Sequence, residues 1–290
     1  MSSQADSGER AAAGGYEHIC LRPLTPHLGA EVFGVDLANL DAATLAEIHR
    51  AFLEYMVLVF RGQNLTQAQH KAFGRHFGAL HVHPSVRHLG ARGDPELFTI
   101  HTTPESRFSN GEAWHSDVSC EPVPPLASIL YVRELPGPSG GDTLFANMYA
   151  AFESLSPPMQ QLLAELDAVH DGRKDLAAYG YHLKPDQTYP CATHPVVVRH
   201  PETGRRLLFV NSSFTSHIVG VSRAESDALL GLLFNHIEAE PRCQCRVRWE
   251  PGTVTLWDNR CTQHHAVWDY HPHTRHAERV TVAGHVAPAR

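Results

Sequence analysis

Short apolar segments, each stopped by Pro, Gly, Asn or Asp, recur along most of this chain and constrain its fold more than any other feature. Each segment is only about four to eight residues long, which suits a β-strand better than a helix. Many short strands of this kind predict an antiparallel β-sandwich or β-barrel. The expected strands cover residues 18–22, 30–35, 56–60, 126–132, 194–200, 207–211, 243–249, 253–257 and 275–283.

Apolar residues at helical spacing predict helices beside these strands. Asp41 and Thr66 can cap the first two helices, and Ser222 with Glu225 forms a capping-box pattern for the last. The sequence therefore predicts a mainly β fold with flanking helices, built as one domain over residues 16–290 behind a flexible polar tail at residues 1–15. The expected helices cover residues 42–55, 66–77, 147–155, 157–169 and 222–239.

Composition excludes several classes of protein. Hydrophobic residues make up 42% and charged residues 19% of the 290 residues, which argues against disorder. A formal net charge of -7 without a Lys/Arg stripe argues against a nucleic-acid partner. No apolar run approaches the roughly 18 residues of a membrane span, and the polar N-terminal segment resembles neither a signal peptide nor an anchor. The six scattered Cys show no disulfide framework, so we expect a cytoplasmic protein.

Two long polar inserts, residues 84–112 and 172–193, contain no clear helix or strand pattern. Loops of this length are unusual in a compact domain unless they have a function. We expect both inserts to be irregular lids that cover a site.

The 22 His residues raise the question of a metal. His115 and Asp117 are two residues apart, so on an extended segment both side chains point to the same face. About one His-x-Asp pair is expected by chance at this composition. A second His far along the chain, such as His264, would complete the arrangement of two His and one carboxylate that non-haem Fe(II) oxygenases use. The spacing of His81 and His83 is also typical of zinc ligands, but no third ligand lies nearby.

Two arginines, Arg275 and Arg279, lie four residues apart on the last expected strand, so their side chains face the same side. The planar fork of a guanidinium pairs well with a carboxylate, which suits a dicarboxylic co-substrate. The alternative is that these arginines pair with carboxylates of the chain, such as Glu278 or Asp269. His200, in a Pro/Gly turn, is expected to be solvated, as are most His residues around His264.

Several motifs in order resemble the taurine dioxygenase / 2,4-dichlorophenoxyacetate dioxygenase family of Fe(II)- and 2-oxoglutarate-dependent enzymes, from about residue 19 to the C-terminus. The resemblance implies a double-stranded β-helix, or jelly roll, in which His115, Asp117 and His264 bind Fe(II). It also implies that Thr143 and Arg275 bind 2-oxoglutarate. The motifs are LGAEVFGVDL, VLVFRGQ, FGALHVHP, WHSDVS, ELPGPSGGDT, HPVVVRHPETG, FVNSSFT and WDNRCTQHHAV.

By the same resemblance, His83, Phe214 and Arg279 contact the primary substrate, with Arg279 meeting its anionic group. Two expected substrate positions depart from the taurine enzyme, because Val86 stands in place of a Tyr and Gly111 in place of an Asn. These departures argue against taurine itself and favour a larger or more apolar anion.

A third departure lies in the second insert, where Asp175 and Leu176 replace a small polar and an aromatic residue. The resemblance implies an enzyme that consumes O2 and 2-oxoglutarate, hydroxylates a C–H bond of a small anionic substrate, and releases succinate and CO2. It also implies a homodimer or homotetramer. The competing class is a non-oxidative jelly-roll protein that binds zinc or another metal as a hydrolase, isomerase or ligand sensor. Such a protein would have no use for the clamp of Thr143 and Arg275.

Overall fold

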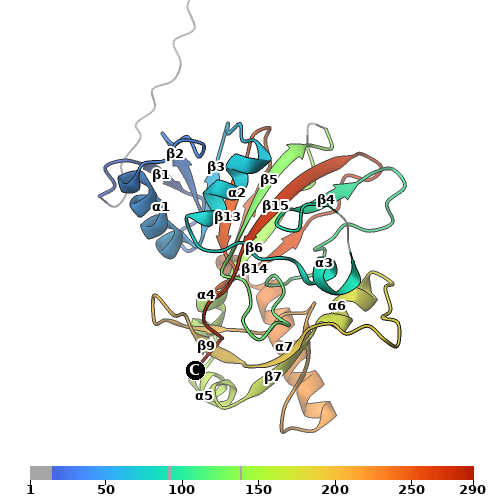
Figure 1. Ribbon diagram of the computed structural model, residues 1–290. Helices are drawn as coiled ribbons and strands as arrows, with labels where there is room; N and C mark the ends of the chain where they lie inside the picture. The colour runs from blue at the N-terminus through green and yellow to red at the C-terminus, as the bar shows by residue number, and fades with distance from the viewer. Residues whose placement is uncertain (1–14, 91–92, 138) are drawn as a thin grey trace, which may run out of the picture.

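The computed structural model describes residues 15–90, 93–137 and 139–290. Nearly all of the predicted N-terminal tail, residues 1–14, lies outside the described residues. A seven-stranded sheet forms the larger half of the molecule (Figure 1), and its strands are antiparallel except for the parallel pair β2 and β3. Across the sheet the strands are β1 (Cys20–Pro23), β2 (Ala30–Phe33), β3 (Val57–Phe60), β13 (Val254–Asp258), β5 (Ala127–Glu134), β15 (Arg275–Val282) and β4 (Phe98–Thr102).

A smaller antiparallel sheet packs against the inner face of this large sheet. It contains β12 (Gln244–Val247), β6 (Thr143–Asn147) and β14 (Thr262–Ala266). Phe145 of the small sheet meets Trp257 of the large one, with ring centroids 5.5 Å apart. The expected sandwich of mainly antiparallel strands is therefore present, and both sheets contribute to one hydrophobic core.

The large sheet separates two cores because successive strand residues face opposite sides. In β3, Val57 and Val59 pack in the core between the sheets, whereas Leu58 and Phe60 pack in the outer core. Two helices cover the outer face: α1 (Ala42–Tyr55), capped by Asp41, and α2 (Gln67–Arg75), capped by Thr66. Both predicted caps are confirmed.

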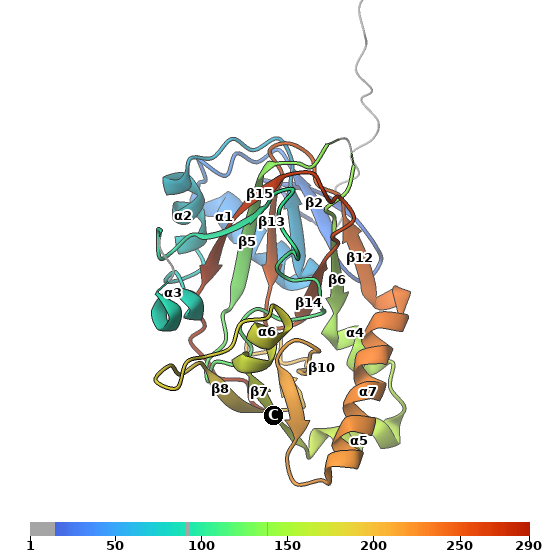
Figure 2. The same ribbon diagram turned by 90° about the vertical axis from the view of Figure 1, so that its right-hand side faces the viewer.

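The remaining elements form the lower half of the molecule in Figures 1 and 2. The predicted capping box of Ser222 and Glu225 begins the long helix α7 (Arg223–Ala239). The elements are a sheet of β11 (Thr215–Ile218), β7 (Asp167–Asp171) and β8 (Cys191–Pro195), a hairpin of β9 (Val197–Arg199) and β10 (Arg206–Leu208), and the helices α4 (Met148–Glu153), α5 (Pro157–Ala164), α7 (Arg223–Ala239) and η1 (Pro241–Cys243).

Several local predictions were wrong. The helix expected over 157–169 ends after α5, and the chain continues as β7 because that segment pairs with β8 and β11. The first insert is not irregular throughout, since it contains α3 (Pro84–Leu89) and β4, which pairs with β15. The second insert contains α6 (Gly172–Ala178) and the first residues of β8.

No helix within the described ranges is long and apolar enough to cross a membrane. All six Cys are free thiols, as predicted.

Candidate active site

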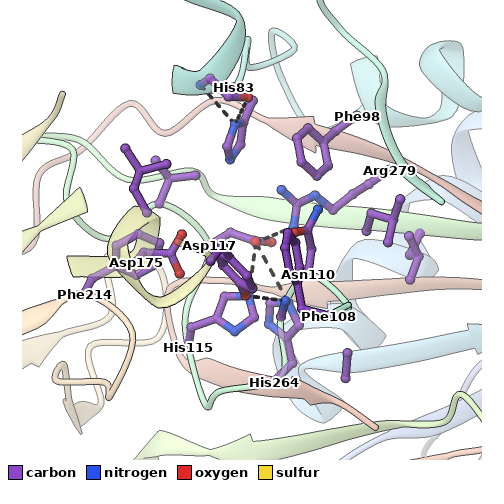
Figure 3. A pocket seen from close by; sticks show the side chains of 18 of the residues that line it. His83, Phe98, Phe108, Asn110, His115, Asp117, Asp175, Phe214, His264 and Arg279 are labelled. Carbon is purple, nitrogen blue, oxygen red and sulfur yellow. Dashed lines mark hydrogen bonds and ion pairs between the residues drawn. The ribbon is translucent and has the colours of Figure 1, made fainter. Parts of the chain in front are cut away.

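Three predicted metal ligands meet at the inner face of the sandwich (Figure 3). His115 and His264 pair as an antiparallel bridge, in which each backbone N–H donates to the other residue's carbonyl, at 3.1 and 2.8 Å. Oδ1 of Asp117 lies 3.7 Å from Nε2 of His115 and 3.9 Å from Nε2 of His264. Two imidazole nitrogens and one carboxylate oxygen therefore converge in the arrangement that leaves adjacent positions open on a bound Fe(II).

Buried partners hold the Asp117 carboxylate in this orientation. Ser128 Oγ donates to Oδ2 of Asp117 at 2.6 Å, which leaves Oδ1 facing the two imidazoles. The Asn259 side chain accepts from the Asp117 N–H at 2.6 Å and donates to its carbonyl oxygen at 2.9 Å. The motifs alone did not reveal the roles of Ser128 and Asn259.

Hydrogen bonding also orients His115. Its Nδ1 lies 2.8 Å from the carbonyl oxygen of Ala113 and donates to it, which leaves Nε2 free to bind a metal. His264 lies on β14 rather than in the polar turn expected from the sequence. Within the described part of the chain, its Nδ1 has no hydrogen-bond partner.

The electrostatics of the triad suit metal binding. Burial alone would raise the pKa of Asp117, but the positive charge of Arg279 and both imidazoles hold it well below its ordinary value. Burial lowers the pKa of His264 well below its ordinary value and keeps the ring neutral. Burial acts in the same direction on His115, but the adjacent Asp117 outweighs it and raises the pKa. An ionised carboxylate and neutral imidazoles are the forms that bind divalent iron, so Asp117 and His264 are held in their binding forms, whereas at His115 the raised pKa makes a metal compete with a proton.

The predicted clamp for 2-oxoglutarate lies beside this triad. Arg275 is only 5% exposed, and within the described ranges its Nε has no hydrogen-bond partner. The alternative partners are engaged elsewhere, since Glu278 pairs with Arg133 at 2.7 Å and Asp269 lies 3.7 Å from Arg246. A buried guanidinium without a carboxylate partner needs an anionic ligand.

Trp249 links both members of this clamp, a role that the sequence did not reveal. Its indole N–H donates to Thr143 Oγ at 3.1 Å. Its ring lies 5.7 Å from the Cζ of Arg275, close enough for a cation–π contact.

A cavity of about 320 Å³ opens beside the triad. Most of the expected substrate residues line it, namely His83, Gly111, Phe214 and Arg279, together with Thr143, Arg275, Asp175 and Leu176. Val86 lines not this cavity but a smaller space beside His83 and Arg279, so its predicted contact with the substrate is wrong. Both inserts line the cavity, because Phe108 and Asn110 come from the first and Tyr179, Tyr181 and Tyr189 from the second.

Gly111 is required where the first insert passes the metal site. Its φ is +89°, and a Cβ atom would lie 3.1 Å from Cε1 of His115. Its N–H donates to the Tyr179 hydroxyl at 2.8 Å, which ties the two inserts together. The Gly in place of Asn therefore lets the backbone lie against the ligand ring.

His83 and Arg279 present polar hydrogens to an otherwise apolar wall. His83 caps α3, and its Nδ1 accepts from the Ser85 N–H at 3.2 Å, so its Nε2 carries the proton that points into the cavity (Figure 3). Burial lowers the pKa of His83 to about 3, which keeps the ring neutral. Arg279 donates from Nη1 to Oδ1 of Asp117, and its Cζ lies 5.0 Å from the Phe98 ring.

A second group with metal-ligand geometry is already satisfied without an ion. His200 was expected to be solvated but is 1% exposed, because its Nε2 donates to Asp258 at 3.1 Å and its Nδ1 accepts the Thr203 N–H. Arg260 neutralises Asp258 at 2.7 Å. His81 donates to Glu121 at 2.8 Å, and no zinc group includes it in the part that the structure describes.

Residues 21–281 match the model of the taurine catabolism dioxygenase TauD, TfdA family. The chain belongs to this family. It is 35% identical to an alpha-ketoglutarate-dependent sulfonate dioxygenase of Saccharomyces cerevisiae, over 90% of this chain and 66% of the relative. It is 37% identical to an alpha-ketoglutarate-dependent sulfate ester dioxygenase of Pseudomonas putida, over 92% of this chain and 90% of the relative.

The crystal structure of a taurine dioxygenase from Burkholderia xenovorans is similar, with a TM-score of 0.79 and 39% identity over 94% of this chain and 91% of that one. As a TauD/TfdA-family member, the chain has the jelly-roll fold that the motifs implied. It is a 2-oxoglutarate-dependent dioxygenase that uses Fe(II) and O2, which favours the oxidative interpretation over the non-oxidative alternative.

Proposed function

We propose that this enzyme hydroxylates the carbon that carries the sulfur group of a small sulfonate or sulfate ester. The anion-binding wall of the cavity, formed by His83 and Arg279, supports this assignment best. Arg279 and the Nε2–H of His83 offer donors to an anion beside the triad, while Phe98, Ile100 and Leu130 surround them with apolar surface. Relatives whose names specify sulfonates and sulfate esters support the same chemical class.

Separate groups of residues would bind the metal cofactor and the co-substrate. His115, Asp117 and His264 would bind Fe(II), whose chemistry is the activation of O2 coupled to conversion of 2-oxoglutarate into succinate and CO2. Arg275 would pair with the far carboxylate of 2-oxoglutarate, and Thr143 would donate a hydrogen bond to it. This clamp would orient the co-substrate and place its charge beside an arginine from which Glu278 and Asp269 are drawn away by other arginines.

Hydroxylation at the substituted carbon makes the product unstable. An α-hydroxysulfonate collapses to an aldehyde and sulfite, and an α-hydroxy sulfate ester collapses to an aldehyde and sulfate. One atom of O2 enters this product and the other enters succinate. His83 and Arg279 would hold the sulfur oxygens so that the adjacent C–H bond faces the metal.

The test is a succinate-release assay with Fe(II), 2-oxoglutarate and O2 across alkanesulfonates, alkyl sulfates and aryloxyalkanoates. We expect stoichiometric sulfite or sulfate from the sulfur-containing substrates. Arg279→Lys should weaken the primary substrate, whereas Arg275→Lys should raise the 2-oxoglutarate requirement. Turnover with carboxylates alone would contradict the proposed substrate class.

We also propose that the enzyme is cytoplasmic, that it forms a homodimer or homotetramer, and that the two inserts close over the bound substrate.

A further inference from the structure

Asp175 is a carboxylate at the cavity that no group of the described chain satisfies. It lies on α6, is half-buried and lines the cavity beside the triad. Within the described ranges no donor hydrogen-bonds to it, and burial, helped by the nearby charge of Asp117, raises its pKa although His115 and Arg279 act in the opposite direction. A carboxylate in such a site is stable only when a donor or a cation meets it.

Figure 3 shows where this carboxylate points. Asp175 and Arg279 lie on opposite sides of Asp117, one from α6 and the other from β15, and both face the ligand cluster. The cavity therefore has an acidic end and a basic end on either side of the reacting centre.

The charges of the cavity balance before any primary substrate enters. Fe(II) carries two positive charges and 2-oxoglutarate two negative ones, and these cancel. The charged side chains lining the cavity in the described part of the chain also cancel, being two carboxylates and two guanidiniums: Asp117, Asp175, Arg275 and Arg279. A simple alkyl anion would therefore leave one uncompensated negative charge in a space largely removed from water, which is unfavourable.

The surroundings of Asp175 also suit a cation. Tyr179, Tyr189 and Phe214 line the same cavity, and aromatic faces attract a positively charged ammonium. A substrate that carries both an anion and an ammonium would fill both ends and keep the cavity neutral.

We propose that Asp175 is a specificity-determining residue that binds the ammonium group of a zwitterionic ω-aminoalkanesulfonate or amino sulfate ester. This inference rests on the proposed function, because Arg279 and His83 must hold the sulfur-containing end. Leu176, which lines the cavity in place of an aromatic residue, leaves room for a chain that is longer or bulkier than the two carbons of taurine.

The experiment compares pairs of substrates that differ only at one end. Each pair is an ω-aminoalkanesulfonate and the alkanesulfonate in which a methyl group replaces the ammonium, over chains of two to six carbons. We expect wild-type kcat/KM to favour the amine of at least one pair by about tenfold or more, which is the scale of one well-placed charged contact. Asp175→Asn should bring the ratio close to one, and Asp175→Leu should favour the methyl compound.

Asp186→Asn is the matched control, because Asp186 is exposed in the same insert and does not line the cavity. It should leave the ratio unchanged. The visible band formed on adding 2-oxoglutarate to the anaerobic Fe(II) enzyme should persist in Asp175→Asn, which shows that the variant folds and loads.

The outcomes separate the two proposals. If wild type oxidises alkanesulfonates or alkyl sulfates with no preference for the amine, or if the preference survives in Asp175→Asn, Asp175 does not select the ammonium and the proposed function stands. If no sulfonate or sulfate ester is oxidised, the proposed function fails and this inference fails with it.

Discussion

At the scale of single residues, the site depends on how each polar group is restrained. Asp117 could present either carboxylate oxygen, but the hydrogen bond from Ser128 to Oδ2 directs Oδ1 toward the imidazoles. Asn259 fixes the backbone beneath it. Groups of this kind orient a metal ligand without touching the metal.

Ser128→Ala should therefore weaken metal binding by about tenfold to a hundredfold, because Asp117 loses the donor that holds its orientation. Titration with Co(II), followed by its absorption bands, measures the affinity independently of turnover. Ser156→Ala is the control, since Ser156 is exposed and makes no side-chain capping bond. Unchanged Co(II) affinity in Ser128→Ala would show that Asn259 and the fold suffice to orient Asp117.

At the scale of elements, the helix α3 brings His83 to the cavity. Arg87, on this helix, pairs with Glu121, whose carboxylate also accepts from His81 at 2.8 Å. Glu121 is 7% exposed, so the pair anchors the first insert to the body of the sandwich. The first insert, which the sequence predicted to be an irregular lid, therefore contains a helix that this ion pair fixes to the body of the protein.

Arg87→Met should raise the KM for the primary substrate about twofold to fivefold, because a partly exposed ion pair contributes at most about 1 kcal/mol to holding His83. The requirement for 2-oxoglutarate should not change, since its clamp lies on β6 and β15. Steady-state kinetics in each ligand measure both values. Arg107→Met, an exposed Arg of the same insert, serves as control. An equal rise in both requirements would contradict this role for α3.

At the scale of the whole molecule, the excess of His has a thermodynamic consequence. Beyond the triad, several His residues are packed inside the protein, and burial lowers their pKa to about 4 or about 3. They are His70, His81 and His194 at about 4, and His83 and His170 at about 3. These rings are neutral in the folded protein near pH 6, whereas in the unfolded chain they titrate near 6.5.

The free energy of unfolding should consequently fall as the pH is lowered from 7.5 to 5.5. Across this range the unfolded chain binds more protons than the folded one, so stability rises with pH. Each such His contributes a slope of up to about 1.4 kcal/mol per pH unit at the acid end. Urea denaturation at several pH values measures the slope. His70→Gln should reduce this slope by up to about 1.4 kcal/mol per pH unit, the contribution of one proton that only the unfolded chain binds. A flat or inverted profile would contradict the neutral burial of these residues.

The sequence by itself determined those features that depend on only a few neighbouring residues. Asp41, Thr66 and Ser222 cap helices as predicted, because a capping side chain acts on backbone N–H groups only two or three residues away. The pair His115 and Asp117 was likewise visible from its spacing. The ordered motifs indicated the family and its fold, which the comparisons confirmed.

Only the tertiary structure decided what depends on residues far apart in the chain. Residues within the expected helix over 157–169 form β7 because distant strands pair with them. Trp249 reaches Thr143 across 106 positions and Arg279 reaches Asp117 across 162, contacts that no local pattern specifies. Whether a polar side chain is satisfied or left for a ligand is set by packing, which is why only the folded chain shows that Arg275 and Asp175 lack a hydrogen-bonded partner among the described residues.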